Sequence, residues 1–466
     1  MLLLAALASS CGAPAASPAP PAPAAQPPTP AAQAAPTPAQ AASPPAHTAL
    51  PPEALALSPE EARLVAAVDA SADDAVAFLE RVVNINSGSM NLAGVREVGR
   101  VFADAFEAIG FETEWVEQSQ VARAGHLFAR RRGQSGARLL LIGHLDTVFE
   151  PDSPFQRYQD LGDGRARGPG VIDMKGGNVV MLYALAALAS IDALADVTIT
   201  VALMGDEELT GEPLSESRRS LIEAAQASDV ALGFEGAGSA NSVTLGRRGF
   251  TDWRLEVEAR TGHSSVIFSD GMGAGAIYEA ARVLTRFYET LAEEPNLTLS
   301  AGLIVGGTTI EHDRARDRGS AFGKSNVIPE RALVTGDLRT LTLDQRERAK
   351  AAMRAIAADS LPHATARLQF RDSYPPMTPT AANEALRVKL EAVGHALQLE
   401  PMEAVDPSRR GAADISFAAP HVAAALAGLG AVGHGAHTAR ETIALDALRV
   451  ATKRAAVFVY RLTRNR

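Results

Sequence analysis

The chain has 466 residues, of which 47% are hydrophobic and 21% charged, a composition that can fill the cores of two folded domains. The formal net charge is −10, and its arginine runs are too short to form a concentrated basic face, which excludes a nucleic-acid partner. The single cysteine, Cys11, excludes an intrachain disulfide and a cysteine-based zinc site.

Residues 1–11 resemble the end of a bacterial lipoprotein signal. The short apolar run Met1–Ala8 and two serines precede Cys11, the residue that is lipidated in such signals. We therefore expect a membrane tether and a folded part outside the cytoplasm, either periplasmic or anchored as a lipoprotein. No Lys or Arg precedes the run, so a start further upstream, or a stray cysteine in a disordered N-terminus, stays open. No uncharged apolar stretch reaches about 18 residues, so we predict no transmembrane helix.

Residues 12–57 form a spacer rich in Ala and Pro. Such a composition buries too little apolar surface to offset the entropy of ordering, so we predict a disordered linker. The folded part begins near Ser58-Pro59-Glu60-Glu61, a sequence typical of a helix N-cap with proline at the first helical position.

Helical and strand patterns alternate over residues 58–247. We predict helices over 74–84, 92–109 and 177–189, and strands over 111–117, 138–142, 197–203 and 230–234. Alternating strands and helices indicate an α/β catalytic domain with a mostly parallel sheet covered by helices on both faces.

The pattern changes between residues 248 and 371. Here we predict strands over 251–259, 296–305 and 332–338 with an amphipathic helix over 277–291. This order favours a smaller α+β domain, a lid or dimerisation domain, inserted into the catalytic domain, which resumes over residues 372–466.

Polar motifs follow three of the predicted strands directly: His144-Leu145-Asp146, Asp206-Glu207-Glu208 and Glu235. In a parallel sheet the carboxyl ends of strands meet at one edge, so these side chains should converge. Histidine and carboxylates are the ligands that Zn²⁺ takes. Singly, each motif is more often a loop pair or a solvated acidic turn. A phosphate-binding loop at Lys175-Gly176-Gly177 is excluded because the spacing is wrong.

In combination these motifs resemble the glutamate carboxypeptidase, acetylornithine deacetylase and aminoacylase family of two-zinc metallopeptidases, from about Ser58 to the end. The glutamate carboxypeptidase branch is the most similar. The stretches that carry the resemblance are Gly143–Val148, Gly168–Gly177, Gly205–Glu208, Gly262–Ser265, Ser325–Pro329 and Gly433–Thr438.

The resemblance implies two divalent metal ions, with zinc as the expected metal. Asp173 would bridge both ions. His144 and Glu235 would complete one site, and Glu208 and His437 the other.

Around these ligands the resemblance implies two further catalytic roles. Asp146 would hold the second nitrogen of the first histidine, which fixes its tautomer. Glu207 would be the general base for the water between the metals. His434, three residues before His437, is an alternative ligand, although the family pattern favours His437. Glu441 is either an outer partner of the site or a helix-start carboxylate.

Substrate contacts are implied for four further residues. His263 and Asn326 match family positions that reach the active site, often from the partner subunit, to stabilise the oxyanion and the substrate. His263 would thus be catalytic, although a surface-loop histidine is the plain alternative. Arg339 resembles an arginine that binds a substrate carboxylate, or it forms an ordinary salt bridge. Gly411 lies in Gly411-Ala412-Ala413-Asp414, an imperfect match to the family's glycine-rich turn.

The sequence thus predicts a metallo-exopeptidase or N-acyl-amino-acid amidohydrolase that releases a C-terminal amino acid, with a possible homodimer formed through the inserted domain. One alternative is a tethered, non-catalytic binding protein, which should have lost a ligand or the base; none is lost. A two-metal phosphatase would explain the metals but not the motifs of the inserted domain.

Overall fold

The computed structural model describes residues 55–314 and 318–464. Cys11, the predicted signal and the spacer up to residue 54 lie outside these residues. Helix α1 (Pro59–Ala70) starts as predicted at Ser58, in a capping box in which Ser58 Oγ accepts from Glu61 N at 3.2 Å and Glu61 Oε2 accepts from Ser58 N at 2.8 Å. No helix in the described part of the chain is both long and apolar enough to span a bilayer.

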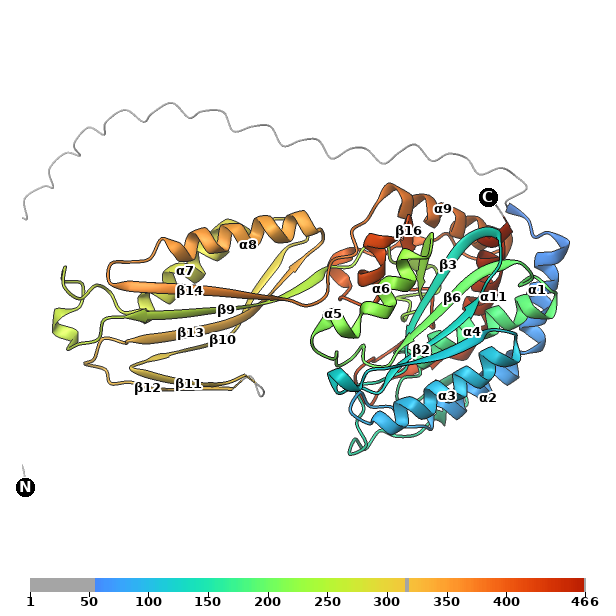
Figure 1. Cartoon of the computed structure of the whole chain (residues 1–466), viewed down its shortest axis with the longest axis horizontal. Coiled ribbons are helices and arrows are strands. Elements are labelled where there is room, and N and C mark those ends of the chain that lie inside the picture. The colour runs from blue at the N-terminus through green and yellow to red at the C-terminus, as the bar shows by residue number, and fades with distance from the viewer. Residues whose placement is uncertain (1–54, 315–317, 465–466) are drawn as a thin grey trace, which may run out of the picture. The chain divides into compact units, whose positions relative to one another are not determined.

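A six-stranded mixed sheet forms the centre of the larger part (Figure 1). Its order is β1 (Glu112–Glu117), β2 (Gly125–Arg131), β6 (Val197–Met204), β3 (Ser135–His144), β7 (Val230–Gly233) and β16 (Ala424–Leu426). Strands β6, β3, β7 and β16 pair in parallel, whereas β1 and β2 run antiparallel at one edge. The predicted fold class is therefore confirmed. Strand β2 was missed because a buried histidine and two arginines interrupt its apolar pattern.

Both faces of this sheet are buried, which explains why β3 is continuously apolar. Leu139 and Leu141 pack on the side of α4 (Lys175–Ser190) and α11 (Leu445–Arg464). Leu140 and Ile142 face the opposite core, which includes side chains of α6 (Arg219–Gln226) and α10 (Ile415–Ala418). The remaining elements of this part are α2 (Ala72–Val83), α3 (Leu92–Ala108), β4 (Gln159–Asp160), β5 (Arg165–Arg167), α5 (Leu214–Ser217), β8 (Ser242–Val243), α9 (Ala381–Ala396), β15 (Glu403–Ala404), β17 (Gly433–His434) and β18 (Thr442–Ala444).

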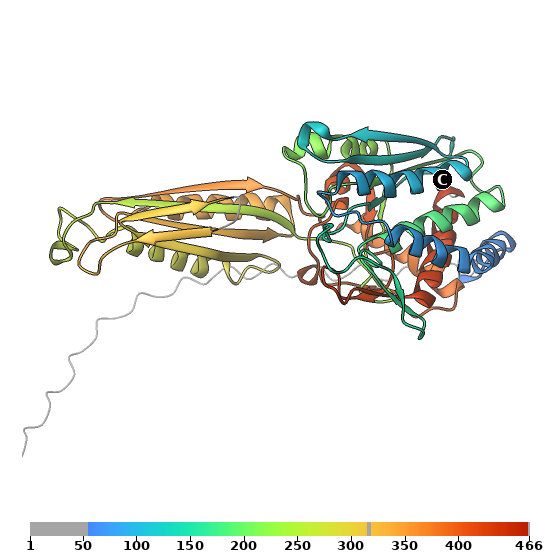
Figure 2. The ribbon, with the colours of Figure 1, turned by 90° about the horizontal axis from the view of Figure 1, so that it is seen from below.

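The inserted segment forms an antiparallel four-stranded sheet in the order β10 (Thr298–Gly307), β13 (Arg331–Thr340), β9 (Gly249–Ala259) and β14 (Ala364–Asp372). Helices α7 (Ala276–Leu291) and α8 (Leu343–Ala358) cover one face and lie behind the strands in Figure 2. Trp253, Leu255 and Val257 alternate along β9 and fill this core. A hairpin, β11 (Thr309–Asp313) and β12 (Arg318–Phe322), follows β10. The domain limits at residues 248 and 371 stay a prediction.

Candidate metal centre and active site

The carboxyl ends of three neighbouring parallel strands carry the predicted motifs. His144 is the last residue of β3, residues 206–208 follow β6, and Glu235 follows β7. Asp173 precedes α4, and His437 lies in the loop between β17 and β18. The fold thus brings all five predicted metal ligands to one edge of the sheet.

These five side chains form two triplets that share Asp173. In the first, His144 Nε2 lies 3.3 Å from Asp173 Oδ1 and 3.7 Å from Glu235 Oε1. In the second, His437 Nε2 lies 3.0 Å from Asp173 Oδ2 and 3.1 Å from Glu208 Oε2. Each oxygen of Asp173 therefore faces a different triplet, which is the arrangement that a carboxylate bridging two cations requires.

The donor set fits a pair of divalent metal ions. Within each triplet the ligand atoms lie within 4.8 Å of one another, and imidazole with carboxylate suits zinc and similar ions. Glu208 Oε1 is buried and has no hydrogen-bond partner among the described residues. Hydrogen bonds to Asp173 and Glu208 raise the pKa of His437 to about 10. The carboxylates of Asp173 and Glu208 thus favour a positive charge next to them.

The loop that carries Asp173 is held by Glu441. Its carboxylate accepts hydrogen bonds from the backbone N–H groups of Gly170 (3.1 Å), Ile172 (2.9 Å) and Asp173 (3.0 Å). Glu441 is fully buried and lies four residues before the first residue of α11, so it is not a carboxylate of the helix start. The structure favours the other alternative, in which Glu441 supports the bridging ligand from outside the metal site.

Lys175-Gly176-Gly177 has a packing role at the start of α4. A Cβ on Gly177 would lie 1.9 Å from the carbonyl oxygen of Phe234, at the end of β7, so only glycine permits this close approach. The buried Lys175 Nζ donates to the carbonyl oxygens of Val82 and Ile85 at 3.0 and 2.9 Å. These contacts hold the start of α4, next to Asp173, against the residue after β7 and the end of α2.

Asp146 fixes the loop after β6. Its Oδ1 accepts from Glu207 N at 3.0 Å, and its Oδ2 accepts from Glu208 N at 3.1 Å and from Ser89 Oγ at 2.6 Å. The nearest acceptor to His144 Nδ1 is the carbonyl oxygen of Asp146 at 3.0 Å, whereas the carboxylate lies at 3.4 Å. The carbonyl oxygen of Asp146 thus contacts the imidazole, while its carboxylate orients the segment that carries the proposed base.

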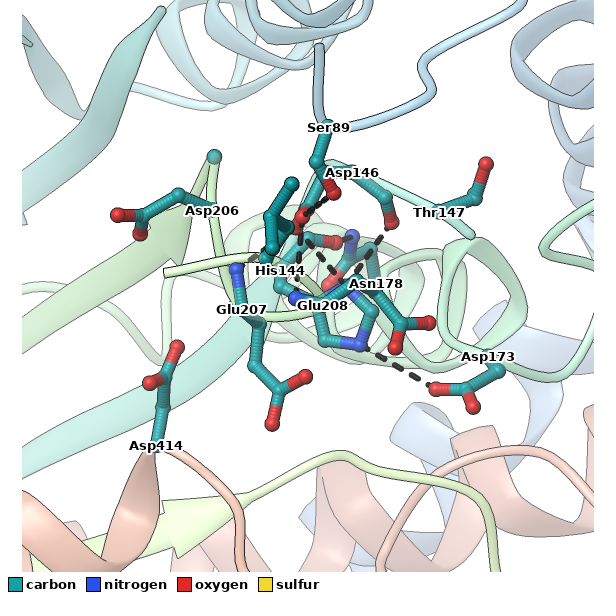
Figure 3. A network of polar contacts seen from close by, with 12 residues as sticks. Ser89, His144, Asp146, Thr147, Asp173, Asn178, Asp206, Glu207, Glu208 and Asp414 are labelled. Carbon is teal, nitrogen blue, oxygen red and sulfur yellow. Dashed lines mark hydrogen bonds and ion pairs between the residues drawn. The ribbon is translucent and has the colours of Figure 1, made fainter. Parts of the chain in front are cut away.

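Glu207 and Glu208 point in different directions, with Glu208 turned toward Asp173 and Glu207 away from it (Figure 3). No hydrogen bond from the described residues reaches the Glu207 carboxylate. Burial and the neighbouring Glu235 raise the pKa of Glu207 well above its usual value. A raised pKa suits a group that must take a proton and release it again near neutral pH.

A buried arginine, which the sequence motifs do not include, supports this segment from the other side. Arg218 donates to Asp206 Oδ1 at 2.6 Å and to Asp414 Oδ1 at 2.8 Å, and none of the three is more than 3% exposed. Arg218 also donates to Tyr374 Oη at 3.3 Å, and this hydroxyl donates to the Glu207 carbonyl oxygen at 3.0 Å. Residues 206–208 are therefore held between Asp146 and the Arg218 network.

Replacing Arg218 with methionine is expected to lower the free energy of unfolding by about 3–5 kcal/mol, because two buried carboxylates lose their counter-charge. Urea denaturation measures the change. The matched control is Arg138→Gln, which breaks an exposed ion pair with Asp229 (side chains 50% and 41% exposed) and should cost less than about 1 kcal/mol. Equal decreases in the free energy of unfolding in the two variants would show that the buried network stabilises the protein no more than an exposed ion pair does.

Replacing His437 or His434 with alanine separates the two candidate ligands. His437 belongs to the second triplet, whereas His434 is an exposed residue of β17 that takes part in neither triplet. We expect His437→Ala to lose about half of the bound metal and His434→Ala to keep it, as measured by mass spectrometry of the dialysed proteins. Full metal content in His437→Ala would contradict the assignment.

The predicted substrate residues lie in two regions. His263 and Asn326 are exposed neighbours in the insert, where the Asn326 carbonyl oxygen accepts from Ser264 N at 2.9 Å. Arg339 is on β13, donates to Asp337 Oδ2 at 2.8 Å and lies over the Phe250 ring. Gly411 is exposed, and its carbonyl oxygen accepts from Arg247.

The profile of peptidase family M20/M25/M40 matches residues 140–461. Carboxypeptidase G2 of Pseudomonas sp. (strain RS-16) is 24% identical over 366 residues, 77% of this chain and 82% of that protein. A succinyl-diaminopimelate desuccinylase of Acidiphilium cryptum (strain JF-5) is 29% identical over 174 residues, 35% of this chain and 44% of that protein. The fold is similar to aminopeptidase PepT of Bacillus cereus ATCC 10987, with a TM-score of 0.67 and 16% identity over 84% of this chain and 98% of that one. The matched profile includes all five candidate metal ligands.

Proposed function

We propose, since the chain belongs to peptidase family M20/M25/M40, that this metal-dependent amide hydrolase releases a C-terminal amino acid from a peptide or an N-acyl amino acid, using two zinc ions. The observation that carries the proposal is the position of Asp173, whose two oxygens face the two ligand triplets. Carboxypeptidase G2, similar over most of its length, supports the carboxypeptidase-like direction of cleavage.

Each residue of the site has a separate task in this reaction. When bound, the two ions supply the positive charge that polarises the scissile carbonyl and lowers the pKa of the attacking water. Asp173 would contact both ions. Glu207 takes a proton from the attacking water and gives it to the leaving amine nitrogen. Asp146 and Tyr374 hold the backbone of Glu207, which keeps its carboxylate in place during both transfers.

Metal analysis combined with a substrate screen tests the proposal. The purified protein is analysed for zinc, manganese and cobalt, and is then assayed with dipeptides and N-acyl amino acids by detecting the released amine. We expect two divalent ions per chain, mostly zinc, and turnover that requires a free C-terminal carboxylate. Turnover of C-terminally amidated substrates at an equal rate would contradict the carboxypeptidase-like direction.

We further propose a homodimer in which His263 and Asn326 complete the partner's active site. Strand β9 begins at Gly249 next to the catalytic domain, where Phe250 N donates to the Tyr374 carbonyl oxygen. His263 follows the other end of this strand. The eleven residues of this strand span about 35 Å, so His263 lies far from the catalytic domain of its own chain. A strictly monomeric protein with full activity, by light scattering, would contradict this proposal.

A membrane tether through lipidated Cys11 and a location outside the cytoplasm, periplasmic or membrane-anchored, also remain proposals. They rest on the short apolar run and the cysteine at the N-terminus. Mass spectrometry of the mature N-terminus from the native host tests them, and an unmodified Cys11 would contradict them.

A further inference from the structure

Two neighbouring arginines have no acidic partner among the described residues: Arg410 contacts the residue that follows the candidate ligand Glu235, and Arg247 lies close to Arg410. Arg410 donates through Nη2 to the carbonyl oxygen of Gly236 at 2.7 Å, and Gly236 follows the ligand Glu235 directly. Its Nε donates to Thr244 Oγ1 at 3.1 Å. Arg247 is 5% exposed and donates through Nη1 to the carbonyl oxygen of Gly411 at 3.2 Å. Both guanidinium groups thus border the loops that carry Glu235 and Gly411.

Neither arginine forms an ion pair with any carboxylate of the residues that the structure describes. Arg247 Nε is buried and makes no hydrogen bond in this part of the chain. Burial and the nearby Arg247 lower the pKa of Arg410. Burying two adjacent cations that hydrogen-bond only to neutral oxygens destabilises the folded protein. Carbonyl and hydroxyl oxygens do not supply the negative charge that would balance the guanidinium groups.

The ligand carboxylates do not supply this charge in the metal-loaded protein. Asp173 and Glu235 attract Arg410 electrostatically, but together with Glu208 they carry less negative charge than two divalent ions carry positive charge. Two arginines described above differ. Arg218 has two buried carboxylate partners, and Arg339 is paired with Asp337.

We propose that Arg410, supported by Arg247, forms an anion subsite on the catalytic body that binds a carboxylate of the substrate beside the metal centre. This inference rests on the proposed function and deepens it, because it names a specificity-determining residue outside the motifs of the family. Arg410 suits the task, since a guanidinium pairs with a carboxylate through two parallel N–H donors. Substrates with a carboxylate at this position are bound more tightly than their neutral analogues.

A binding measurement tests the subsite independently of turnover. The metal-loaded wild-type protein and the variants Arg410→Gln and Arg409→Gln are titrated with glutarate in a calorimeter. Arg409 is the matched control, because it is the exposed neighbour in the same loop and carries the same charge. We expect Kd for glutarate to rise at least about tenfold in Arg410→Gln, the loss of a charged hydrogen-bonding partner, and less than about twofold in Arg409→Gln.

Kinetics with matched substrates then identify which carboxylate is bound. N-acetylglutamate is compared with N-acetylglutamine, N-succinylalanine with N-butanoylalanine, and N-acetylalanine with its amide. For each pair, the KM of the neutral compound is divided by the KM of the compound with the carboxylate. If Arg410 binds that carboxylate, this ratio falls toward one in Arg410→Gln, with kcat little changed. Absence of turnover with every compound contradicts the proposed function, while the glutarate titration still tests the subsite.

Two outcomes would overturn the subsite. The first is an unchanged Kd for glutarate in Arg410→Gln. The second is loss of metal from Arg410→Gln, because that result would make Arg410 a support of the Glu235 loop through its bond to Gly236. Arg410→Lys adds a separate check: it keeps the charge and loses the planar fork, so it should retain part of the affinity for glutarate.

Discussion

Replacing Glu207 with glutamine is expected to lower kcat by about 10²–10⁴-fold while both metal positions stay filled. Glutamine has the shape of glutamate but cannot take a proton from water. The backbone contacts of this residue, to Asp146 and Tyr374, do not involve its side chain. The variant should therefore fold normally and lose only the proton transfer.

Three measurements on Glu207→Gln are needed together: kcat, metal content and thermal unfolding. The matched control is the adjacent Glu208→Gln, in which a ligand to the second site is changed, and which should lose metal as well as activity. Wild-type turnover by Glu207→Gln would exclude it as the base. Loss of metal from Glu207→Gln would instead assign it to the ligand set.

The candidate metal ligands could be predicted because three of them lie at or just after the ends of apolar strands. His144, Glu208 and Glu235 are placed by β3, β6 and β7, and parallel strands bring their carboxyl ends to one edge whatever the details of packing. Asp173 and His437 lie in loops, and the sequence implied their roles only through the family's motifs. The structure adds the division of the five into two triplets, each facing one oxygen of Asp173.

The support behind these ligands could not be predicted in the same way. Asp206, Arg218, Tyr374 and Asp414 meet only because a loop, a helix junction and two distant segments fold together. A lone arginine after a short helix is usually a surface residue, and no spacing in the sequence distinguishes Arg218 from one. Arg410 is hidden for a similar reason, since it lies where the glycine-rich motif of the family is imperfect.

Glu441 illustrates the intermediate case. Its place four residues after His437 suggested a role near the metals, but a carboxylate before a helix is equally consistent with an interaction with the helix dipole. Its three hydrogen bonds to the backbone of residues 170–173 distinguish the two possibilities. Burial raises the pKa of Glu441 to about 7, which the same hydrogen bonds oppose.

Replacing Asp173 with alanine is expected to remove both metal ions, because this residue is the only one shared by the two triplets found among the described residues. Metal that binds only the folded protein stabilises it by about 2.7 kcal/mol when its concentration is a hundred times Kd. At about 2–4 °C per kcal/mol for domains larger than 150 residues, chelation should lower the Tm of the wild-type protein by about 5–10 °C. In Asp173→Ala the chelator should leave Tm unchanged, because no metal remains to be removed.

The two effects of Asp173→Ala, on metal content and on the chelator-dependent Tm, are linked by the same binding free energy and must change together. Scanning fluorimetry with and without chelator measures the second, and mass spectrometry of the dialysed protein the first. Asp229→Ala is the control, since it removes an exposed carboxylate paired with Arg138 at the opposite end of β7 and should keep the full chelator shift. If Asp173→Ala lost only one ion and kept about half of the shift, the two sites would bind independently and Asp173 would not be their bridge. Loss of both ions together with the whole chelator-dependent Tm shift requires that one side chain contributes to both sites. The short distances from the two oxygens of Asp173 to His144 and His437 imply this shared role.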